Sequence, residues 1–147
     1  MGLSDGLSGK LVGIDSAPLI YYIEEHPLYG SILDPAFKAV AVGRIRLVAS
    51  TMLLAEVLVH PIRAGDEALS QKYHDILIGS ENIDIFPVTA AVAQIAAELR
   101  AERRLKTPDA IQLATAMHCG AEAFLTNDRD FPVGLGIDIR RLRDYRS

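Results

Sequence analysis

Five carboxylates stand where this sequence is otherwise rich in apolar residues. Asp15 follows the run LVGI, Glu56 lies within TMLLAEVLVH, Asp109 opens DAIQLATA, and Asp128 and Asp130 follow AFLTN. A carboxylate in apolar surroundings is unfavourable unless another group offsets its charge. Several carboxylates at one point also repel one another, and a bound divalent cation is the usual remedy. The pattern therefore indicates metal-dependent chemistry on phosphate groups, provided that the fold brings these segments together.

The chain between these acids alternates between strands and helices. Short apolar runs predict strands near residues 10–14, 46–49, 83–88 and 123–125, with a last one within 137–142. Helical spacing and capping signals predict helices over about 16–25, 32–43, 50–59, 66–78, 89–104 and 107–119. This alternation requires crossover connections and a parallel sheet. We expect one α/β domain, with a short, mostly parallel sheet flanked by helices in an α/β/α sandwich.

Three local signals predict where helices begin or end. Ser16 is expected to cap the first helix, and the dipeptide His60-Pro61 is expected to break the helix that contains Glu56. Thr107 is expected to be an N-cap residue, with Pro108 at the first helical position. These signals place the acids near helix starts.

The predicted elements bring the acids to one edge of the sheet. Asp15 and Asp128 each follow a strand directly, and in an open parallel sheet functional groups gather outside the carboxyl ends of the strands. Asp109 lies in the first turn of a helix and Glu56 in the second turn of another. Taken one at a time, the aspartates could instead be turn, dipole-favouring or solvated loop residues. Glu56 is harder to explain in that way, because its neighbours on both sides are apolar.

Composition narrows the possible classes of protein. A length of 147 residues and a hydrophobic content of 50% suit one domain with an ample core. The net charge of −4 argues against a bulk polyanion binder but not against a nuclease, whose substrate meets the charge of one cleft. Cys119 is the only cysteine, which favours a reducing compartment, and no stretch approaches the ~20 apolar residues of a membrane span. We expect a cytoplasmic protein with a flexible leader over residues 1–9.

Four segments together resemble a known family. IDSAPLIYYIE, TMLLAEVL, TPDAIQLATA and LTNDRDF are similar, in this order, to the four acidic motifs of the PIN-domain ribonucleases. The resemblance is strongest to the toxin subunits of VapBC toxin–antitoxin pairs, and it spans residues 12–131. It implies that residues 10–147 form a PIN-like nuclease domain that hydrolyses RNA, leaving a 5′-phosphate and forming no covalent intermediate.

The resemblance also implies a role for each acid and for three neighbours. The family's four catalytic acids fall on Asp15, Glu56, Asp109 and Asp128. Three further positions match residues that support the acids or metal-held water, namely Ser16, Thr126 and Asn127.

We expect the acids to divide the work around Mg²⁺ or Mn²⁺, which prefer oxygen ligands. Asp15, Asp109 and Asp128 are expected to be direct ligands, and Asp130 is expected to help hold a second ion. Glu56 would bind through water or orient the nucleophilic hydroxide.

Basic residues near the acids are candidates for contact with RNA. They precede the Asp109 helix or lie in the acidic loop: Arg103, Arg104, Lys106 and Arg129. A solvated helix end with favourable dipole placement explains the first three equally well. The tail DIRRLRDYRS carries four more arginines, for which contact with nucleic acid, contact with an acidic partner and plain solvation stay open, solvation being the commonest.

Membership of the toxin class implies protein partners. Such toxins are usually silenced by an antitoxin whose chain crosses the cleft, here a VapB-like protein, and they commonly pair as homodimers through the first helices. Apolar residues at 19, 20, 22 and 23 and over 32–42 offer a surface for such pairing, although core packing explains them as well. A housekeeping RNA-processing PIN nuclease, and a PIN domain that binds RNA or protein without cutting, are the alternatives.

Overall fold

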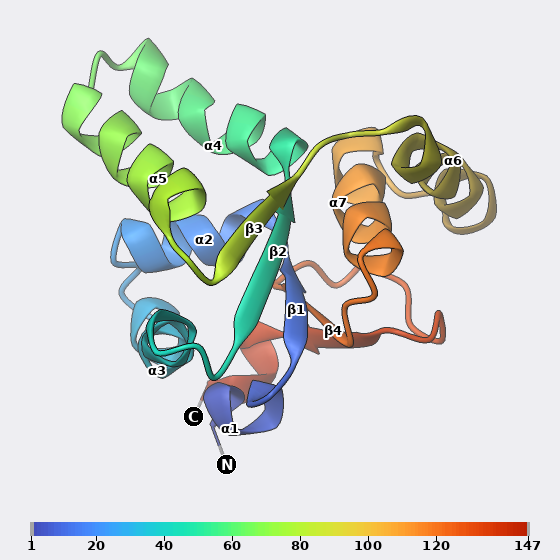
Figure 1. The fold of residues 1–147 in the computed structure, drawn as a ribbon, viewed down its shortest axis with the longest axis horizontal. Coiled ribbons are helices and arrows are strands. Elements are labelled where there is room, and N and C mark those ends of the chain that lie inside the picture. Colours follow the sequence, from blue (N-terminus) through green and yellow to red (C-terminus); the bar gives the residue numbers. More distant parts are fainter. Residues whose placement is uncertain (1, 147) are drawn as a thin grey trace.

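Short parallel strands form a twisted sheet through the middle of the molecule (Figure 1). The computed structural model describes residues 2–146, and within them the sheet has five strands in the order β3-β2-β1-β4-β5. The strands are β1 (Leu11–Ile14), β2 (Arg46–Ser50), β3 (Ile83–Phe86), β4 (Ala123–Thr126) and β5 (Asp138–Arg141). Every adjacent pair is parallel, so the five carboxyl ends share one edge. The predicted α/β architecture with a parallel sheet is confirmed.

Helices cover both faces of this sheet. The helices are α1 (Leu3–Leu7), α2 (Ser16–Ile23), α3 (Gly30–Ala41), α4 (Thr51–Arg63), α5 (Glu67–Gly79), α6 (Ala90–Arg103) and α7 (Thr107–His118), followed by a 3₁₀ turn, η1 (Leu142–Tyr145). Side chains alternate across each strand, so Leu47 of β2 packs with α2–α5 while Val48 packs with α6 and α7. The two hydrophobic layers make the expected α/β/α sandwich (Figure 1).

One glycine lets α7 lie unusually close to the sheet. A Cβ atom at Gly13 of β1 would collide with the Cβ of Ala116 in α7 and would stand 2.9 Å from the Phe124 ring. Only hydrogen fits there, because interiors are close-packed. The close approach fixes α7, and with it the first turn that carries Asp109, against the central strand.

Pro61 and Thr107 do not mark helix boundaries in the way that was predicted. Helix α4 does not break at Pro61 but continues to Arg63. Pro61 lies near the last turn, where its missing amide forfeits a single bond, and its ring is buried on the same face as Leu53 and Val57. Helix α7 has Lys106 as its N-cap residue, so Thr107 is already inside the helix.

The segment expected to be a flexible leader takes part in the fold. Residues Leu3–Leu7 form α1, which packs against α3. Leu3 and Leu7 lie four residues apart on one helical face and are both buried in the main hydrophobic cluster. Their burial gives these residues a structural role at the end of the sheet opposite to the acids.

The side chains expected to offer a dimer surface are largely used within the protomer. Leu19, Ile23, Leu33 and Phe37 are buried in the core, and the Tyr22 ring stacks on Phe37 with the centroids 3.9 Å apart. Core packing therefore accounts for the four buried positions, whereas Val42, at the end of the expected surface, is 69% exposed. None of the helices within residues 2–146 is long and apolar enough to cross a membrane.

Candidate active site

Asp15 stands directly at the carboxyl end of β1 and is the N-cap residue of α2. Its Oδ1 accepts a hydrogen bond from the Ser16 amide at 2.8 Å, and its Oδ2 accepts one from the Thr126 hydroxyl at 2.9 Å. Asp15, and not Ser16 as expected, is therefore the capping residue. Both carboxylate oxygens are held, and the residue is only 5% exposed.

The Thr126 hydroxyl joins Asp15 to the loop that follows β4. It donates to Asp15 and at the same time accepts a hydrogen bond from the Asp128 amide at 3.1 Å. Asp128 in turn accepts a bond from the Asp130 amide at 2.8 Å, which closes a tight turn. Parallel pairing of β1 and β4 brings these two strand ends to the same level, with the Asp15 amide bonded to the Leu125 carbonyl.

The four acids interact electrostatically with one another. Burial, opposed by the bonds from Thr126 and Ser16 but helped by the nearby Asp109 and Asp128, raises the pKa of Asp15 to about 6. Burial first, and then the charges of Asp15 and Asp109, raises the pKa of Glu56. Burial and the charge of Asp128 raise the pKa of Asp109, against the effect of Lys106. Because these charges act on one another's pKa values, acids from four separate segments of the chain must lie close together, and they form one cluster.

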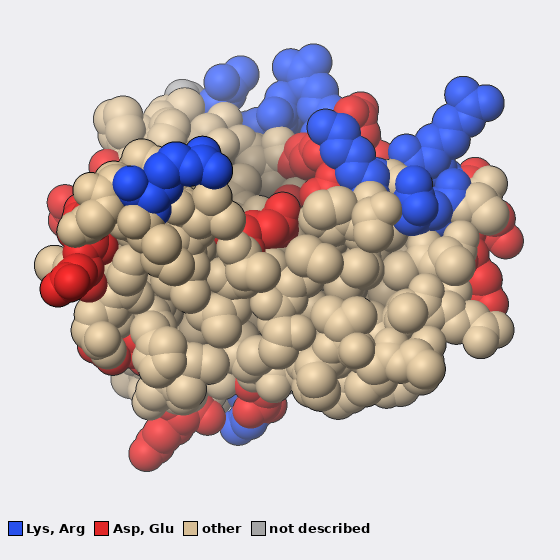
Figure 2. All heavy atoms as spheres, turned by 90° about the horizontal axis from the view of Figure 1, so that it is seen from above, with Lys and Arg blue, Asp and Glu red and all other residues tan. Residues whose placement is uncertain are grey.

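The surface of the molecule is hollowed at the carboxyl edge. Figure 2 looks onto this edge and shows acidic side chains in a depression, with Lys and Arg side chains standing around its rim. Of the basic candidates, Lys106 is the one that acts on an acid of the cluster, through Asp109. Arg103, Arg104 and Arg129 are exposed, and Arg104 ends α6 in the left-handed conformation with φ of 58°.

Three residues expected to assist the acids have different positions. Thr126 bonds directly to Asp15, whereas Ser16 contributes its backbone amide. The Asn127 side chain is buried and points away from the acids, because its Oδ1 accepts a hydrogen bond from the Arg143 amide at 3.0 Å. Asp130 is exposed on the loop.

Three residues of this site had no role in the sequence prediction. The Gln112 side chain, 2% exposed, donates a hydrogen bond from Nε2 to Oε1 of Glu56. Its position three residues after Asp109 puts both on one face of α7, a spacing that can be read from the sequence. Arg141 and Arg143 donate hydrogen bonds to carbonyls of the acidic loop, and no local sequence pattern predicts these contacts.

The donor set suits a hard divalent cation. The four acids supply carboxylate oxygens, and none of them forms an ion pair with a Lys or Arg within residues 2–146, where the ion pairs are Arg46–Asp84 and Arg140–Asp138. In the described part of the chain, no three His, Cys, Asp or Glu side chains are already grouped closely enough to hold a metal ion. A cation at this edge would therefore draw the carboxyl groups together as it offsets their repulsion.

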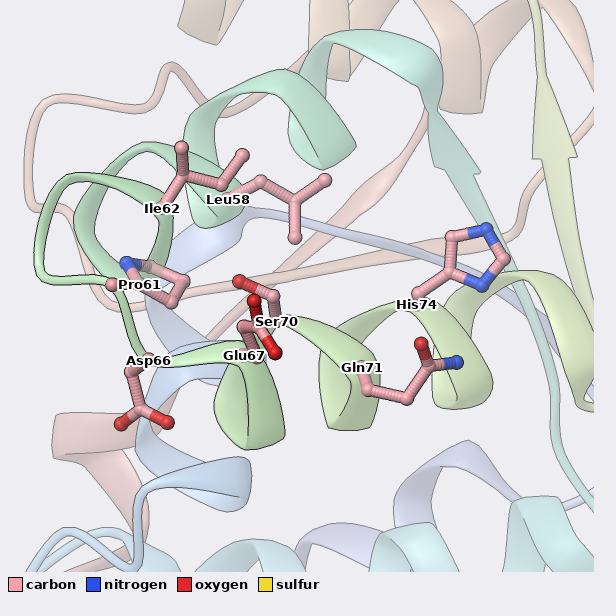
Figure 3. A pocket seen from close by; sticks show the side chains of 9 residues that line it. Leu58, Pro61, Ile62, Asp66, Glu67, Ser70, Gln71 and His74 are labelled. Atoms are coloured by element: carbon pink, nitrogen blue, oxygen red, sulfur yellow. The ribbon is translucent and has the colours of Figure 1, made fainter.

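A well-formed hollow in the surface lies elsewhere. It measures about 540 Å³, lies between α4 and α5, and has Leu58, Pro61 and Ile62 on one side and Ser70 and His74 on the other (Figure 3). None of the four clustered acids lines it. Its walls combine apolar side chains with polar ones, and its two carboxylates, Asp66 and Glu67, are exposed at the start of α5.

Fold and site together define an α/β protein whose parallel sheet carries a partly buried acidic site at its carboxyl edge. The chain belongs to the PIN domain family, because the model of that family matches residues 13–133, which include all five candidate acids. The resemblance of the four acidic segments to this family is thereby confirmed. None of the curated proteins matches the sequence.

Several solved structures share the fold. A chain of VapBC2 from Rickettsia felis, bound to a DNA fragment from its promoter, has a TM-score of 0.69 at 18% identity, with 89% of this chain and 98% of that chain covered. A toxin–antitoxin complex from Klebsiella pneumoniae gives 0.63 at 24% identity, covering 90% and 97%. VapC20 from Mycobacterium tuberculosis, a sarcin-ricin loop cleaving toxin, gives 0.60 at 16% identity, covering 78% and 86%. At these identities the likeness is one of fold.

Proposed function

We propose that this protein is a metal-dependent endoribonuclease that hydrolyses RNA phosphodiester bonds, and that it is the toxin of a type II toxin–antitoxin pair. The observation that carries the proposal is the cluster of Asp15, Glu56, Asp109 and Asp128 at one edge of the sheet. Asp15 is buried, the other three are partly buried, and none of them forms an ion pair within residues 2–146. Acids that raise one another's pKa reduce stability, so a functional reason is the best explanation for them. Membership of the PIN domain family supports the same activity.

In the proposed mechanism, each aspartate of the site is a metal ligand. Asp15, fixed by Thr126 and Ser16, together with Asp109 and Asp128 would hold Mg²⁺ or Mn²⁺, and Asp130 would help hold a second ion. A bound divalent ion lowers the pKa of water and neutralises charge on the attacked phosphate.

Glu56 is assigned the handling of the attacking water. Gln112 donates to its Oε1, which leaves Oε2 with no hydrogen bond among the described residues. That oxygen would accept a hydrogen bond from the water and so orient it toward the phosphate.

The substrate proposal rests on charge around the hollow. Lys and Arg side chains surround the acidic depression (Figure 2), and phosphate contacts supply most of the affinity of proteins for nucleic acid. Lys106, Arg103, Arg104 and Arg129 are the candidates for this contact. A similar fold belongs to a toxin described as cleaving the sarcin-ricin loop, which supports an RNA substrate here.

The partner proposal is a VapB-like antitoxin that covers the acidic edge and presents a basic side chain to it. Similar folds occur in chains of VapBC2 and of another toxin–antitoxin complex, which supports such a partner. A small DNA-binding protein encoded beside this gene would favour the toxin over a housekeeping nuclease. A homodimer is also proposed, but it would use surfaces other than Leu19, Ile23 and Phe37, which are buried. Sedimentation as a monomer at micromolar concentration would exclude it.

The test is cleavage of labelled total RNA with Mg²⁺, Mn²⁺ or EDTA. We expect metal-dependent cleavage by the parent protein, loss of cleavage in Asp109→Asn, and unchanged cleavage in the matched control Asp84→Asn, whose exposed carboxylate lies outside the cluster. The protein must first be shown to be free of bound antitoxin. Absence of cleavage by antitoxin-free parent protein across the pool would overturn the proposal in favour of a binding module.

A further inference from the structure

The C-terminal segment runs alongside the acidic loop. Strand β5 pairs in parallel with β4, and the register sets Arg141 opposite Thr126, the last residue of β4. The chain then turns into η1, so residues 141–143 lie beside the loop that begins at Asn127. This segment lies beyond residue 133, where the match to the PIN domain family ends.

Arg141 spans the acidic loop with two donors of one guanidinium group. Its Nε donates to the Asp128 carbonyl at 3.3 Å, and its Nη2 donates to the Phe131 carbonyl at 2.7 Å. The two carbonyls are three residues apart, so the planar fork of the arginine holds both ends of the turn that contains Asp130. A lysine has one compact ammonium group and cannot reproduce this geometry.

Arg143 holds the start of the same loop. Its backbone amide donates to Oδ1 of Asn127 at 3.0 Å, and its Nη2 donates to the Asn127 carbonyl at 2.8 Å. Its Nε is buried and has no hydrogen-bond partner within residues 2–146. Arg143 is thus partly buried and bonded to the loop, which differs from the solvated tail that is commonest for such sequences.

The four tail arginines divide into distinct types. Arg140 pairs with Asp138 at 2.6 Å and donates to the Tyr145 hydroxyl at 2.7 Å. Arg141 and Arg143 bond to loop carbonyls and form no ion pair within residues 2–146. Arg146 is exposed and has no hydrogen bond to the loop in the described part of the chain. Arg141 and Arg143 can therefore be tested by substitution, with Arg146 in the same short segment as the control.

We propose that Arg141 and Arg143 are positioning residues that hold the loop of residues 127–131 so that Asp128 stays beside Asp15 and Asp109. The chain of contacts is continuous, because the loop they hold also bonds through the Asp128 amide to Thr126, which bonds to Asp15. The expected effect of these arginines on catalysis rests on the proposed ribonuclease function. Their effect on the position of the loop does not depend on that function.

The first measurement is hydrogen–deuterium exchange at the amides of residues 127–131 in Arg141→Lys, Arg143→Lys and the control Arg146→Lys. All three variants keep the positive charge. Arg141→Lys loses the forked pair of bonds and Arg143→Lys loses the Nη2 bond to the Asn127 carbonyl, whereas Arg146→Lys loses no bond to the loop. We expect exchange of the loop amides to accelerate about tenfold or more in Arg141→Lys and Arg143→Lys and to stay unchanged in Arg146→Lys. Unchanged loop exchange in both test variants would overturn the proposal. If one test variant fails to unfold cooperatively on heating, the other carries the test.

The second measurement separates positioning from contact with RNA. Positioning predicts that kcat falls and that the Mn²⁺ concentration for half-maximal activity rises, each about tenfold, while KM stays the same. A rise in KM alone, together with a shallower salt dependence, would mean that these arginines bind phosphate and would overturn the proposal. A parent protein that cleaves no RNA would refute the ribonuclease function, and the exchange measurement would still decide whether the loop is held.

Discussion

Aspartates on the outermost strands of the sheet and aspartates at its centre have different surroundings. Asp84 on β3 pairs with Arg46 at 3.3 Å, and Asp138 on β5 pairs with Arg140 at 2.6 Å. The side chain of Asp84 is 60% exposed and that of Asp138 is 46% exposed. Asp15, at the end of β1 in the middle of the sheet, is 5% exposed and has only neutral hydrogen-bond donors.

This difference shows which acids reduce stability. An exposed ion pair contributes about 0–1 kcal/mol and is replaceable. A carboxylate that is withdrawn from water near others of the same sign is unfavourable, as its raised pKa reports. Three groups are in this state: Asp15, which is buried, and Glu56 and Asp109, which are partly buried. Acids of the central group should therefore matter for activity and reduce stability, while acids of the outer group should matter little for either.

The largest expected effect is on catalysis. Asp15→Asn should reduce RNA cleavage to below about 1% of the parent rate, since a proposed metal ligand loses its charge. The fold should persist, because the amide oxygen can still accept one of the two hydrogen bonds that Asp15 receives. Cleavage assays and circular dichroism on the same preparation check both parts. Retained cleavage would remove Asp15 from the catalytic group.

The free energy of unfolding should depend on pH differently in the parent protein and in Asp15→Asn. The folded pKa of Asp15 is about 6, above its ordinary value of 3.8, so the folded state binds the proton more tightly than the unfolded state does. Its contribution to stability is complete below about pH 3.8 and is lost as the pH rises through 6.

Asp15→Asn should therefore gain stability relative to the parent between pH 4 and pH 8, by at most about 3 kcal/mol. Urea unfolding of both proteins in metal-free buffer across this range measures the gap. A gap that is the same at every pH would contradict the assignment of the raised pKa to Asp15.

Close packing under the central acids should be sensitive to a single methyl group. Gly13→Ala should destabilise the fold by about 1–3 kcal/mol, because the new Cβ would collide with Ala116 of α7 and press on Phe124. Gly79→Ala is the matched control, since a Cβ there meets nothing within 4 Å, and it should be neutral or slightly stabilising. Chemical denaturation of the two variants checks this, and equal effects would refute a tight contact between α7 and β1.

The sequence allowed the positions of the central acids and the supporting place of Thr126 to be predicted, but not the contacts of Arg141 and Arg143 with the acidic loop. Asp15 and Asp128 follow strand ends and Asp109 lies in the first turn of a helix. These positions depend on local sequence signals, so they can be predicted without knowledge of the tertiary structure. Arg141 reaches the Asp128 carbonyl only because β5 pairs with β4 in one particular register, and register depends on the whole sheet. Pro61 continues its helix because burial of its ring offsets the lost hydrogen bond, which is a tertiary effect that overrides propensity.

The smallest effect is expected for an acid of the outer strands, and it provides the contrast with the central acids. Asp84→Asn removes an exposed carboxylate and its ion pair with Arg46, so the free energy of unfolding should change by less than about 0.5 kcal/mol. Metal-dependent cleavage should be unchanged, because Asp84 is not among the groups that shift the pKa of Asp15, Glu56 or Asp109. Unfolding curves and initial cleavage rates measured beside Asp15→Asn test this. A loss of activity comparable to that of Asp15→Asn would mean that position at the carboxyl edge does not separate functional acids from structural ones.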